Sequence, residues 1–599
     1  MFFKPTIRSC QVAFRNSSFR NPQSAIRNSS FRVRHSEEAV PPVYAREDLL
    51  AARFRFAKVL PYQQSAPFIS NLSLAIFSGL LLVFAFPDWN LWSLGWVGTA
   101  PLIMAVARER KFWRSLLFGT ITGTIFFAGS SHWVTYSMHN YGDIPLVLSY
   151  VVVVIFAATL GVFTGLFAAV LGLCVKHLGG WAILAAPAVW AASEWLRLEA
   201  TGMGWNPLGY SQAFQPAVIQ IARFGGVYLV SAIMVAASTA LVFAVVYLER
   251  RRGIVVLTAA GLIAIAAVLY GESLRPSVDD SGSITAAVIQ PNIPIDGAWD
   301  DHKFFDEMLL RHISLSEQAV RANVRDRNAD AASTEKNSSI DLIIWPESPM
   351  NFEYDRDPGL RRKLGDFTTR NQVYLLMNSW GFSPGRTTGN SDEPQYNSAI
   401  LISPAGEKIA EYDKNALMPF GEYVPGRRWL PFMDRIKALA GDITAGTSLS
   451  LPNAAGAKLG ALICFESTRP DLARRMRSAG ASAFVQLSNE AWFGPTSAPR
   501  QMLATAIFRA VENNTDVIRA TNSGLSARID RYGIVSGETP TFETATRTWK
   551  IKTEDEVRGD SLTFYTRHGD IFVIACTVVS LLLLVAAATR SAWEKKHQE

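Results

Sequence analysis

Residues 459–466 read Leu-Gly-Ala-Leu-Ile-Cys-Phe-Glu, and this stretch indicates both a fold class and a candidate reactive residue. Its apolar run predicts a buried β-strand that ends at Cys464. Reactive side chains often lie at strand ends in α/β sheets, so Cys464 is a candidate nucleophile. A buried structural cysteine would also fit this position. Because Cys464 is the only cysteine between residues 272 and 569, no disulfide can form within that region.

A second apolar run, 341–348, reads Asp-Leu-Ile-Ile-Trp-Pro-Glu-Ser. Proline stops a strand, so Glu347 is expected at the strand end. A cysteine nucleophile needs a base, and burial beside a tryptophan would raise the pKa of Glu347 toward the neutral range. The alternative is a solvated glutamate in a turn. Histidine is the usual base, but the three histidines of this region lie outside strand-end motifs: His302, His312 and His568.

The third candidate is Lys414, in the stretch 411–425, Glu-Tyr-Asp-Lys-Asn-Ala-Leu-Met-Pro-Phe-Gly-Glu-Tyr-Val-Pro. A lysine at a strand end can hold its charge next to a thiolate and a developing oxyanion. Taken alone, Lys414 is more typical of a solvated surface lysine. The region contains no Gly-x-Ser-x-Gly motif, which leaves the cysteine as the candidate nucleophile.

Short apolar runs alternate with helical patterns between residues 272 and 569, which predicts an α/β or α+β domain. Expected strands are 284–290, 341–345, 373–378, 398–402, 458–463, 483–487, 516–521 and 526–530. Expected helices are 302–326, 357–370, 469–479 and 499–513.

The composition of the whole chain is typical of a membrane protein. Of the 599 residues, 49% are hydrophobic and 18% are charged, whereas soluble proteins carry about 25% charged residues. A crossing helix needs about 20 apolar residues, so we expect about eight crossings. The apolar segments are 68–86, 92–107, 115–130, 145–174, 181–197, 228–247, 253–270 and 571–589. The expected division is a bundle of about seven spans at 67–271, an extracytoplasmic domain at 282–556 and a C-terminal transmembrane helix at 570–590.

Basic residues predict the orientation. Lys and Arg follow alternate apolar segments, while loops 87–91 and 131–143 contain none. The positive-inside rule therefore places both termini in the cytoplasm and the α/β domain on the far side of the membrane. These positions also explain the net charge of +7 without a nucleic-acid partner. Residues 1–66 form a basic extension, interpreted as a disordered tail or an over-extended start; a transit peptide is the alternative.

Together, Trp345-Pro346-Glu347, Lys414 ahead of Pro-Phe-Gly-Glu-Tyr-Val-Pro, and Ile463-Cys464-Phe465-Glu466 resemble the nitrilase (carbon–nitrogen hydrolase) superfamily. Stretches 488–494 and 521–524 fit the same pattern. The flanking membrane segments, together with Glu-Trp-Leu-Arg at 194–197 and the stretch 201–212, make residues 70–590 similar to the membrane-embedded apolipoprotein N-acyltransferase branch. The chain departs from that pattern at Gly204, Phe465 and Met502, where proline, tyrosine and histidine are common.

The resemblance implies an α-β-β-α sandwich and a Glu347–Lys414–Cys464 triad that needs no metal ion or cofactor. It implies acyl transfer from a phospholipid to the N-terminal amine of a diacylglyceryl apolipoprotein, through a thioester on Cys464, at a bacterial inner membrane with the domain on the periplasmic side. The resemblance also implies supporting residues, namely Glu422, Glu466 and Phe465. The implied substrate-lining residues are Trp299, Phe420 and Trp492. The three lining aromatics could instead be ordinary core residues.

Two other functions remain open from the sequence. A membrane-anchored nitrilase-type amidase or hydrolase would share the triad and use water as the acceptor. A transporter or receptor would tolerate loss of Cys464 and is expected to bury charges in its spans, where Glu194 is the main candidate.

Overall fold

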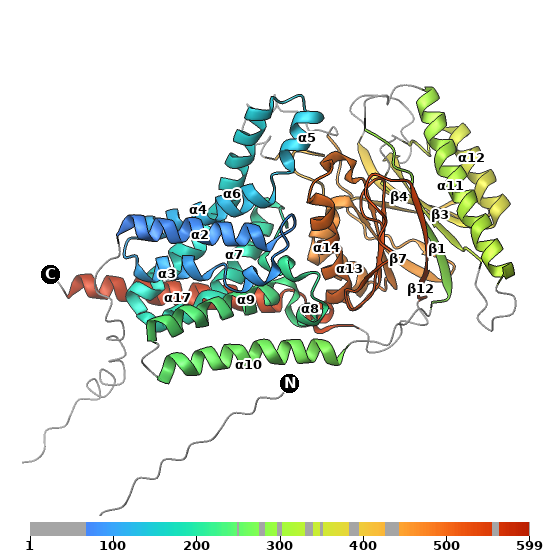
Figure 1. The fold of residues 1–599 in the computed structure, drawn as a ribbon. Coiled ribbons are helices and arrows are strands. Elements are labelled where there is room, and N and C mark those ends of the chain that lie inside the picture. The colour runs from blue at the N-terminus through green and yellow to red at the C-terminus, as the bar shows by residue number, and fades with distance from the viewer. Residues whose placement is uncertain are drawn as a thin grey trace, which may run out of the picture. The chain divides into compact units, whose positions relative to one another are not determined.

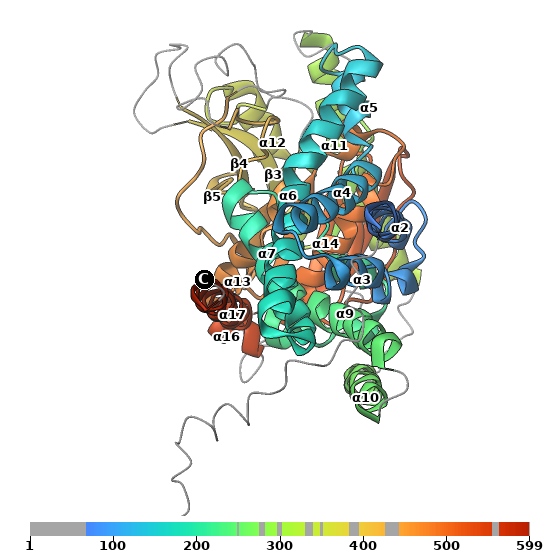
Figure 2. The ribbon, with the colours of Figure 1, turned by 90° about the vertical axis from the view of Figure 1, so that its left-hand side faces the viewer.

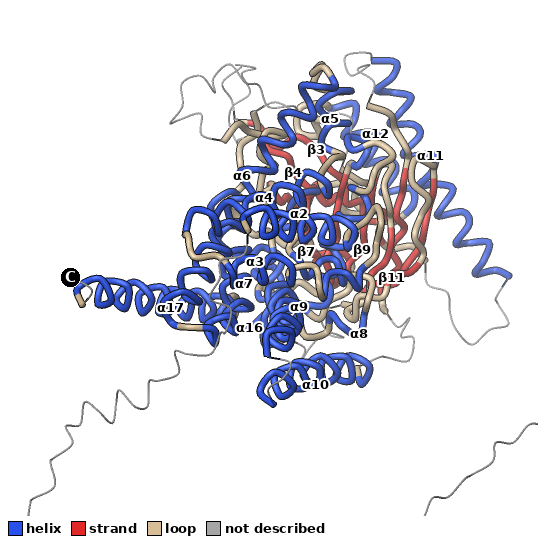
Figure 3. Tube along the Cα trace, turned by 60° about the vertical axis from the view of Figure 1, so that its left-hand side comes forward, coloured by secondary structure: helices blue, strands red, loops and turns tan. Residues whose placement is uncertain are grey.

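Helices form the two ends of the described chain, and an α/β region lies between them in sequence (Figures 1 and 3). The computed structural model describes residues 67–247, 251–274, 282–295, 302–329, 339–347, 352–382, 394–425, 442–553 and 562–597. The extension 1–66 and Trp299 lie outside the described residues.

The helical region contains long apolar helices joined by short turns. Its elements are α2 (Phe68–Ala85), η2 (Trp92–Trp96), α3 (Ala100–Arg108), α4 (Phe112–Ser130), α5 (Val134–Asn140), α6 (Leu146–Leu178), η3 (Gly180–Ala185), α7 (Ala186–Thr201), η4 (Leu208–Gln212), α8 (Pro216–Ile219), α9 (Ala222–Tyr247), α10 (Arg251–Ser273), α16 (Phe564–His568) and α17 (Ile571–Lys596). Five of the described helices are long and apolar enough to cross a membrane: α2, α6, α9, α10 and α17. The chain is therefore a membrane protein.

The segment expected as one span at 92–107 is divided in the structure. It forms the short turn η2 and then α3, which has nine residues and begins with a proline in its first turn. A nine-residue helix is about 14 Å long, whereas the hydrocarbon core is about 30 Å thick. Helix α3 alone is too short to cross it. The segments expected as spans at 115–130 and 181–197 overlap α4, which has 19 residues, and α7, which has 16.

Helices α4 and α6 pack against each other through glycines spaced four residues apart. A Cβ added at Gly123 would lie 2.7 Å from the Cα of Gly161, and one added at Gly161 would lie 2.7 Å from the backbone nitrogen of Thr124. Gly119 and Gly165 meet in the same way, with 2.8 Å from an added Cβ on Gly119 to the Gly165 Cα. Small residues at this spacing allow membrane helices to approach closely.

The α/β region contains two six-stranded sheets. The first has the order β12-β1-β2-β3-β4-β5, and the second β11-β10-β9-β8-β7-β6. The strands of the first are β1 (Ile284–Gln290), β2 (Leu342–Ile344), β3 (Tyr374–Phe382), β4 (Gln395–Ile402), β5 (Lys408–Asp413) and β12 (Ala545–Ile551). Those of the second are β6 (Asn453–Ala454), β7 (Ala457–Ile463), β8 (Ala483–Ser488), β9 (Val517–Thr521), β10 (Ala527–Ile529) and β11 (Val535–Ser536).

Alternate side chains of a strand enter different apolar cores. In β1, Ala286 and Val288 join the large core shared with β7 and β8, whereas Ala287 and Ile289 join a second core under the helices. Both faces are therefore buried, which explains strands without polar alternation. The helices that cover the sheets are α11 (His302–Ala329) and α12 (Pro358–Asn371) on the first, and α13 (Pro470–Ser478) and α14 (Ala498–Asn513) on the second (Figure 1).

All expected strands and helices of this region overlap observed elements. The sequence prediction missed β5, β6, β11 and β12. Strands β6 and β11 contain only two residues each, and β5 and β12 lie at the two edges of the first sheet and carry exposed or half-buried polar side chains. Such strands lack the apolar pattern by which a buried strand is recognised.

Candidate active site

Glu347, Lys414 and Cys464 all lie at the ends of strands. Glu347 lies three residues after β2, Lys414 follows β5 directly, and Cys464 follows β7 directly. Strands β2 and β3 are parallel, and β4 is antiparallel to both β3 and β5. Strands β2 and β5 consequently run in the same direction, and their carboxyl ends share one edge of the first sheet.

Lys414 is a buried cation held by two carboxylates. Its side chain is 1% exposed, and Nζ donates a hydrogen bond to Glu422 Oε1 at 2.7 Å. Glu347 Oε1 lies 3.7 Å from the same Nζ. Burial alone would lower the pKa of Lys414, but the charges of Glu422 and Glu347 outweigh burial and raise this pKa above its usual value. The lysine can therefore act as a fixed positive charge.

Glu347 is oriented by hydrogen bonds at both oxygens. Oε1 accepts from Asn397 Nδ2 at 3.0 Å, and Oε2 accepts from the backbone N–H of Asn489 at 3.0 Å. Asn397 Nδ2 also lies 3.2 Å from Glu422 Oε1, so it lies between the two carboxylates that flank Lys414. These contacts fix the Glu347 carboxylate in one orientation, as a positioned proton acceptor requires.

Cys464 begins the turn η7 (Cys464–Thr468) and is 8% exposed. Its φ of +51° lies in the left-handed region, which is uncommon for a residue with a side chain and is found in strained functional turns. Burial raises the pKa of the thiol, and the charge of Glu347 raises it further, while the charge of Lys414 lowers it. At neutral pH the thiol is protonated, so forming the thiolate requires a base.

Glu466 connects the Cys464 turn to the segment that follows Lys414. Its Oε1 accepts from Tyr412 Oη at 2.8 Å and from the backbone N–H groups of Asn415 and Ala416 at 2.7 and 3.0 Å. Its Oε2 accepts from the Ile463 N–H at 2.8 Å. Burial raises the pKa of Glu466 to about 7. Glu466 therefore joins the backbone segments next to Cys464 and Lys414.

Glu422, in contrast, contacts the lysine directly. Besides the bond from Lys414, it accepts the backbone N–H of Met418 at 2.8 Å through Oε2. The two glutamates that the sequence predicted as supporting residues thus have different contacts.

The predicted aromatic residues occupy different surroundings. Phe420 is 43% exposed. The ring of Trp492 is 5.1 Å from that of Tyr141, which follows α5. Phe465 is buried in a cluster with Trp133 and Trp205 of the helical region. Trp299 lies outside the described residues.

Sequence reasoning missed the residues that bond to Glu347, the candidate base, and to the turn that begins at Cys464. Asn397 lies in β4 with no surrounding motif, and Gln486 Nε2, in β8, donates to the backbone oxygen of Cys464 at 3.2 Å. Asn489 belongs to the stretch 488–494, which the sequence indicates only as part of a family pattern. Each acts across strands that are distant in sequence, so no local signal identified it.

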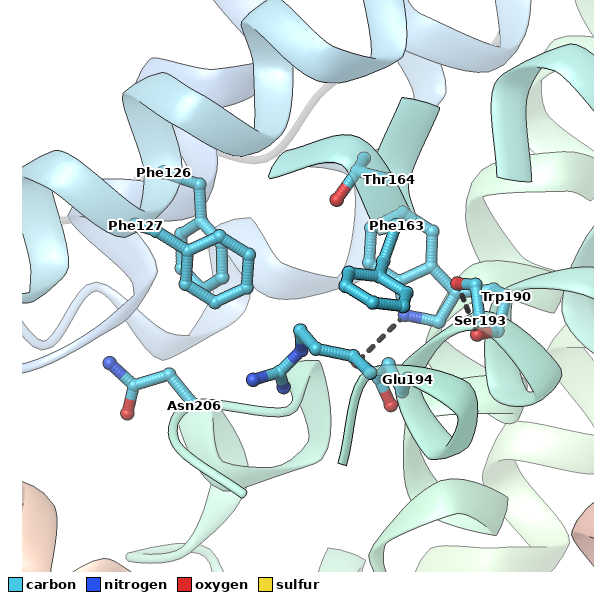
Figure 4. A pocket seen from close by; sticks show the side chains of 9 residues that line it. Phe126, Phe127, Phe163, Thr164, Trp190, Ser193, Glu194 and Asn206 are labelled. Carbon is cyan, nitrogen blue, oxygen red and sulfur yellow. Dashed lines mark hydrogen bonds between the residues drawn. The ribbon is translucent and has the colours of Figure 1, made fainter. Parts of the chain in front are cut away.

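A small cavity lies inside the helical region, between α4, α6 and α7 (Figure 4). Its volume of about 20 Å³ is enough for about one water molecule. Two buried charged residues line it. Glu194 Oε1 accepts from Trp190 Nε1 at 2.8 Å and from the Leu208 N–H at 2.7 Å, and Arg197 donates to the Met203 carbonyl at 2.8 Å. These charged groups hold the loop after α7.

Known proteins are similar to this chain over both regions. The family model described as "Apolipoprotein N-acyltransferase N-terminal domain" matches residues 78–240, and the one described as "Carbon-nitrogen hydrolase" matches residues 285–557. An apolipoprotein N-acyltransferase from Geobacter metallireducens is 30% identical over 532 residues, which cover 86% of this chain and 95% of the relative. One from Vibrio parahaemolyticus is 28% identical over 79% of this chain and 89% of the relative.

Among solved structures, a nitrilase-superfamily protein from Saccharomyces cerevisiae matches 47% of this chain and 96% of its own, with 17% identity and a TM-score of 0.33. The similarity to the Geobacter protein extends through the membrane helices and the nitrilase-like α/β domain. This chain therefore belongs to the apolipoprotein N-acyltransferase family.

Proposed function

We propose that this protein transfers an acyl chain from a phospholipid to the N-terminal amine of a diacylglyceryl-cysteine apolipoprotein, through a thioester on Cys464. The observation that carries the proposal is the buried ion pair of Lys414 with Glu347 and Glu422, whose charges act on the Cys464 thiol. Membership of the family supports phospholipid and lipoprotein substrates. The catalytic roles that follow are part of the proposal.

In the first half-reaction, Glu347 takes the proton of Cys464, and the thiolate attacks the ester carbonyl of the phospholipid. Lys414 and the backbone N–H of Phe465 stabilise the oxyanion; losing one such donor typically costs about 3–4 kcal/mol. When the intermediate collapses, a C–S bond remains, the C–O ester bond breaks, and Glu347 protonates the departing lysophospholipid oxygen. Lys414 stays protonated throughout, consistent with its raised pKa.

In the second half-reaction, the uncharged amine of the apolipoprotein attacks the thioester. The C–N bond forms, the C–S bond breaks, and Glu347 accepts the amine proton before returning it to the thiolate. Dividing the transfer into two steps gives ping-pong kinetics. Phe420, which is 43% exposed, and Trp492, which is half-buried, would contact the lipid chains, and the same role is proposed for Trp299.

The proposed membrane arrangement counts eight crossings: the five long apolar helices, α4, α7, and the composite segment of η2 and α3. Residues 67–271 would form the bundle, 282–556 the periplasmic catalytic domain and 570–590 the last crossing of the bacterial inner membrane, with 1–66 as an N-terminal extension. Basic residues support this orientation because Arg108, Lys176 and Lys595 lie at helix ends that alternate along the chain. Both termini would then be cytoplasmic.

Acyl trapping tests the proposed function. The purified protein is incubated with phospholipid carrying a labelled acyl chain, and a hydroxylamine-sensitive adduct should form. Cys464→Ala should abolish the adduct, whereas Cys174→Ala, which removes a buried thiol from α6, should retain it. Adding a diacylated lipopeptide should move the label to the peptide amine. A persistent adduct in Cys464→Ala would show that Cys464 is not the nucleophile. If the label is released only as free fatty acid, the result would favour the hydrolase, which uses water as the acceptor.

A further inference from the structure

Gln501, on helix α14 of the α/β domain, makes hydrogen bonds to three separate segments of the helical region. Its Oε1 accepts from Trp133 Nε1 at 3.3 Å, Trp205 Nε1 at 2.7 Å and Asn206 Nδ2 at 3.3 Å. Its Nε2 donates to the carbonyls of Pro87 and Ser130 at 3.0 and 2.8 Å. The side chain is 2% exposed. One buried amide therefore joins three loops that are far apart in sequence.

The tryptophans that bond to Gln501 also pack against the residue next to the nucleophile. Trp133 and Trp205 have ring centroids 5.0 Å apart and share a buried cluster with Phe465, Phe493 and Met502. Phe465 directly follows Cys464 in the turn η7. A shift of the tryptophans would therefore shift the turn that holds the thiol.

A backbone contact joins the same loop to the other end of that turn. A Cβ added at Gly204 would clash with the carbonyl oxygen of Thr468, the last residue of η7. The loop beside Trp205 thus fits closely against the turn η7. Such close backbone approach is a common reason for a glycine.

A second set of contacts joins the helical region to the residues that hold Glu347, the proposed base. Ser137 Oγ, on α5, donates to the Trp492 carbonyl at 2.7 Å, and Trp133 packs on Phe493 with ring centroids 4.7 Å apart. Both partners lie in the turn η8 (Glu490–Phe493), directly after Asn489. The Asn489 N–H is the donor that holds Glu347 Oε2.

We propose that Gln501 is a positioning residue, which holds the helical region against the turns η7 and η8 and so sets the geometry of Cys464 relative to Glu347. This inference rests on the proposed function for the roles of those two residues. It gives the membrane helices a part in the chemistry besides anchoring. Misplacing a reacting group by about 1 Å can cost about 100-fold in rate.

The test compares Gln501→Met with a matched control, Gln220→Met. Gln220 is 1% exposed, so it is as buried as Gln501, and it also joins the two regions, since its Nε2 donates to the Tyr532 carbonyl at 2.8 Å. Its bonds do not reach η7 or η8. Methionine matches glutamine in length and removes the hydrogen bonds. Both variants are purified as full-length protein in detergent, and the rate of thioester formation with a labelled phospholipid is measured together with the thermal midpoint.

We expect Gln501→Met to lower the rate constant of thioester formation at saturating phospholipid by about 10- to 100-fold, with little change in the half-saturating phospholipid concentration. Gln220→Met should stay within about twofold of the unmodified protein at a similar thermal midpoint. Equal losses in both variants, or no loss in Gln501→Met, would overturn the inference. If Gln501→Met cannot be purified, Trp205→Phe takes its place in the test, because it removes one of the three donors to Gln501. We expect this variant to lower the rate constant of thioester formation about three- to tenfold.

A second readout does not depend on acyl transfer. The rate of iodoacetamide alkylation at Cys464, measured by peptide mass spectrometry across pH, reports how readily the thiolate forms. Gln501→Met should shift this pH profile, and Gln220→Met should not; an unchanged profile in both would overturn the positioning role. If the unmodified protein forms no thioester, the proposed function fails while the alkylation comparison still tests the role of Gln501.

Discussion

Glu466 shows how one buried carboxylate joins parts of the site that lie far apart in the sequence. It accepts hydrogen bonds from the strand before Cys464 and from the segment after Lys414. Four N–H and O–H donors favour its charged form, but burial has the larger effect and raises its pKa to about 7. A group with a raised pKa makes folding depend on pH near neutrality.

The sign of that dependence follows from the direction of the shift. Because the pKa of Glu466 is higher in the folded protein than in the unfolded chain, the folded state binds the proton more tightly. Its stabilising contribution is fully present below about pH 4.5 and is lost as the pH rises through about 7. Glu466→Gln keeps the shape of the side chain and an acceptor oxygen but does not titrate.

We therefore expect the thermal midpoint of the unmodified protein to fall relative to that of Glu466→Gln between about pH 5 and about pH 8. The measurement is thermal unfolding in detergent at one scan rate, with both proteins in the same buffers. Parallel curves across this range would contradict the prediction. A lower midpoint for the variant at every pH is compatible with it, because the glutamine loses the bond from Ile463.

At the scale of elements, glycines bring the backbones of α4 and α6 close together. Lipid tails are as apolar as leucine, so hydrophobic burial alone gives little reason for membrane helices to associate, and close packing has to supply it. The glycines at positions 119, 123, 161 and 165 permit backbone contact along one stripe. This stripe fixes α4, and with it the segment that carries Trp133.

Gly161→Leu should destabilise the protein because the new side chain would overlap the backbone of α4, and overpacking typically costs about 1–3 kcal/mol. Gly261→Leu on α10 is a matched control, since nothing lies within 4 Å of a Cβ at that position. The measurement is the thermal midpoint and the yield of monodisperse protein in detergent. Equal behaviour of the two variants would show that the glycine contact is not needed.

At the scale of the whole molecule, two helix ends that carry basic residues meet. His177 Nδ1, at the end of α6, lies 3.0 Å from Glu594 Oε2, near the end of α17. Lys176 and Lys595 are therefore at the same end of the helical region. The loops that carry Trp133 and Trp205 contact the α/β domain instead. Figure 2 gives a second view of these helices, turned by 90° from Figure 1.

This arrangement predicts which positions a membrane-impermeant thiol reagent can reach. The native cysteines of the described chain are buried, so single cysteines are introduced at two exposed positions, Lys596→Cys at the end of α17 and Arg362→Cys on α12. In cells with a permeabilised outer membrane, Arg362→Cys should be labelled and Lys596→Cys should not. Both should be labelled after lysis. The reverse pattern in unlysed cells would contradict the proposed orientation.

The sequence by itself determined the features that depend on neighbouring residues. Long apolar runs predicted α2, α6, α9, α10 and α17 because a helix satisfies its backbone within its own segment. Buried strands and their terminal residues were predicted because short apolar runs are local signals. The stretches around Glu347, Lys414 and Cys464 were found for the same reason, and the family membership that they implied is confirmed.

Only the tertiary structure decided which of these residues meet and what surrounds them. Asn397 beside Glu347, Glu466 bonded to the segment after Lys414, and Gln501 bonded to Trp205 of the helical region are all contacts between distant segments. A single asparagine or glutamine has no periodicity, so nothing in its sequence neighbourhood indicates its partner. Such contacts arise because packing two sheets and a helix bundle brings those segments together, and burial then requires each polar group to find a partner.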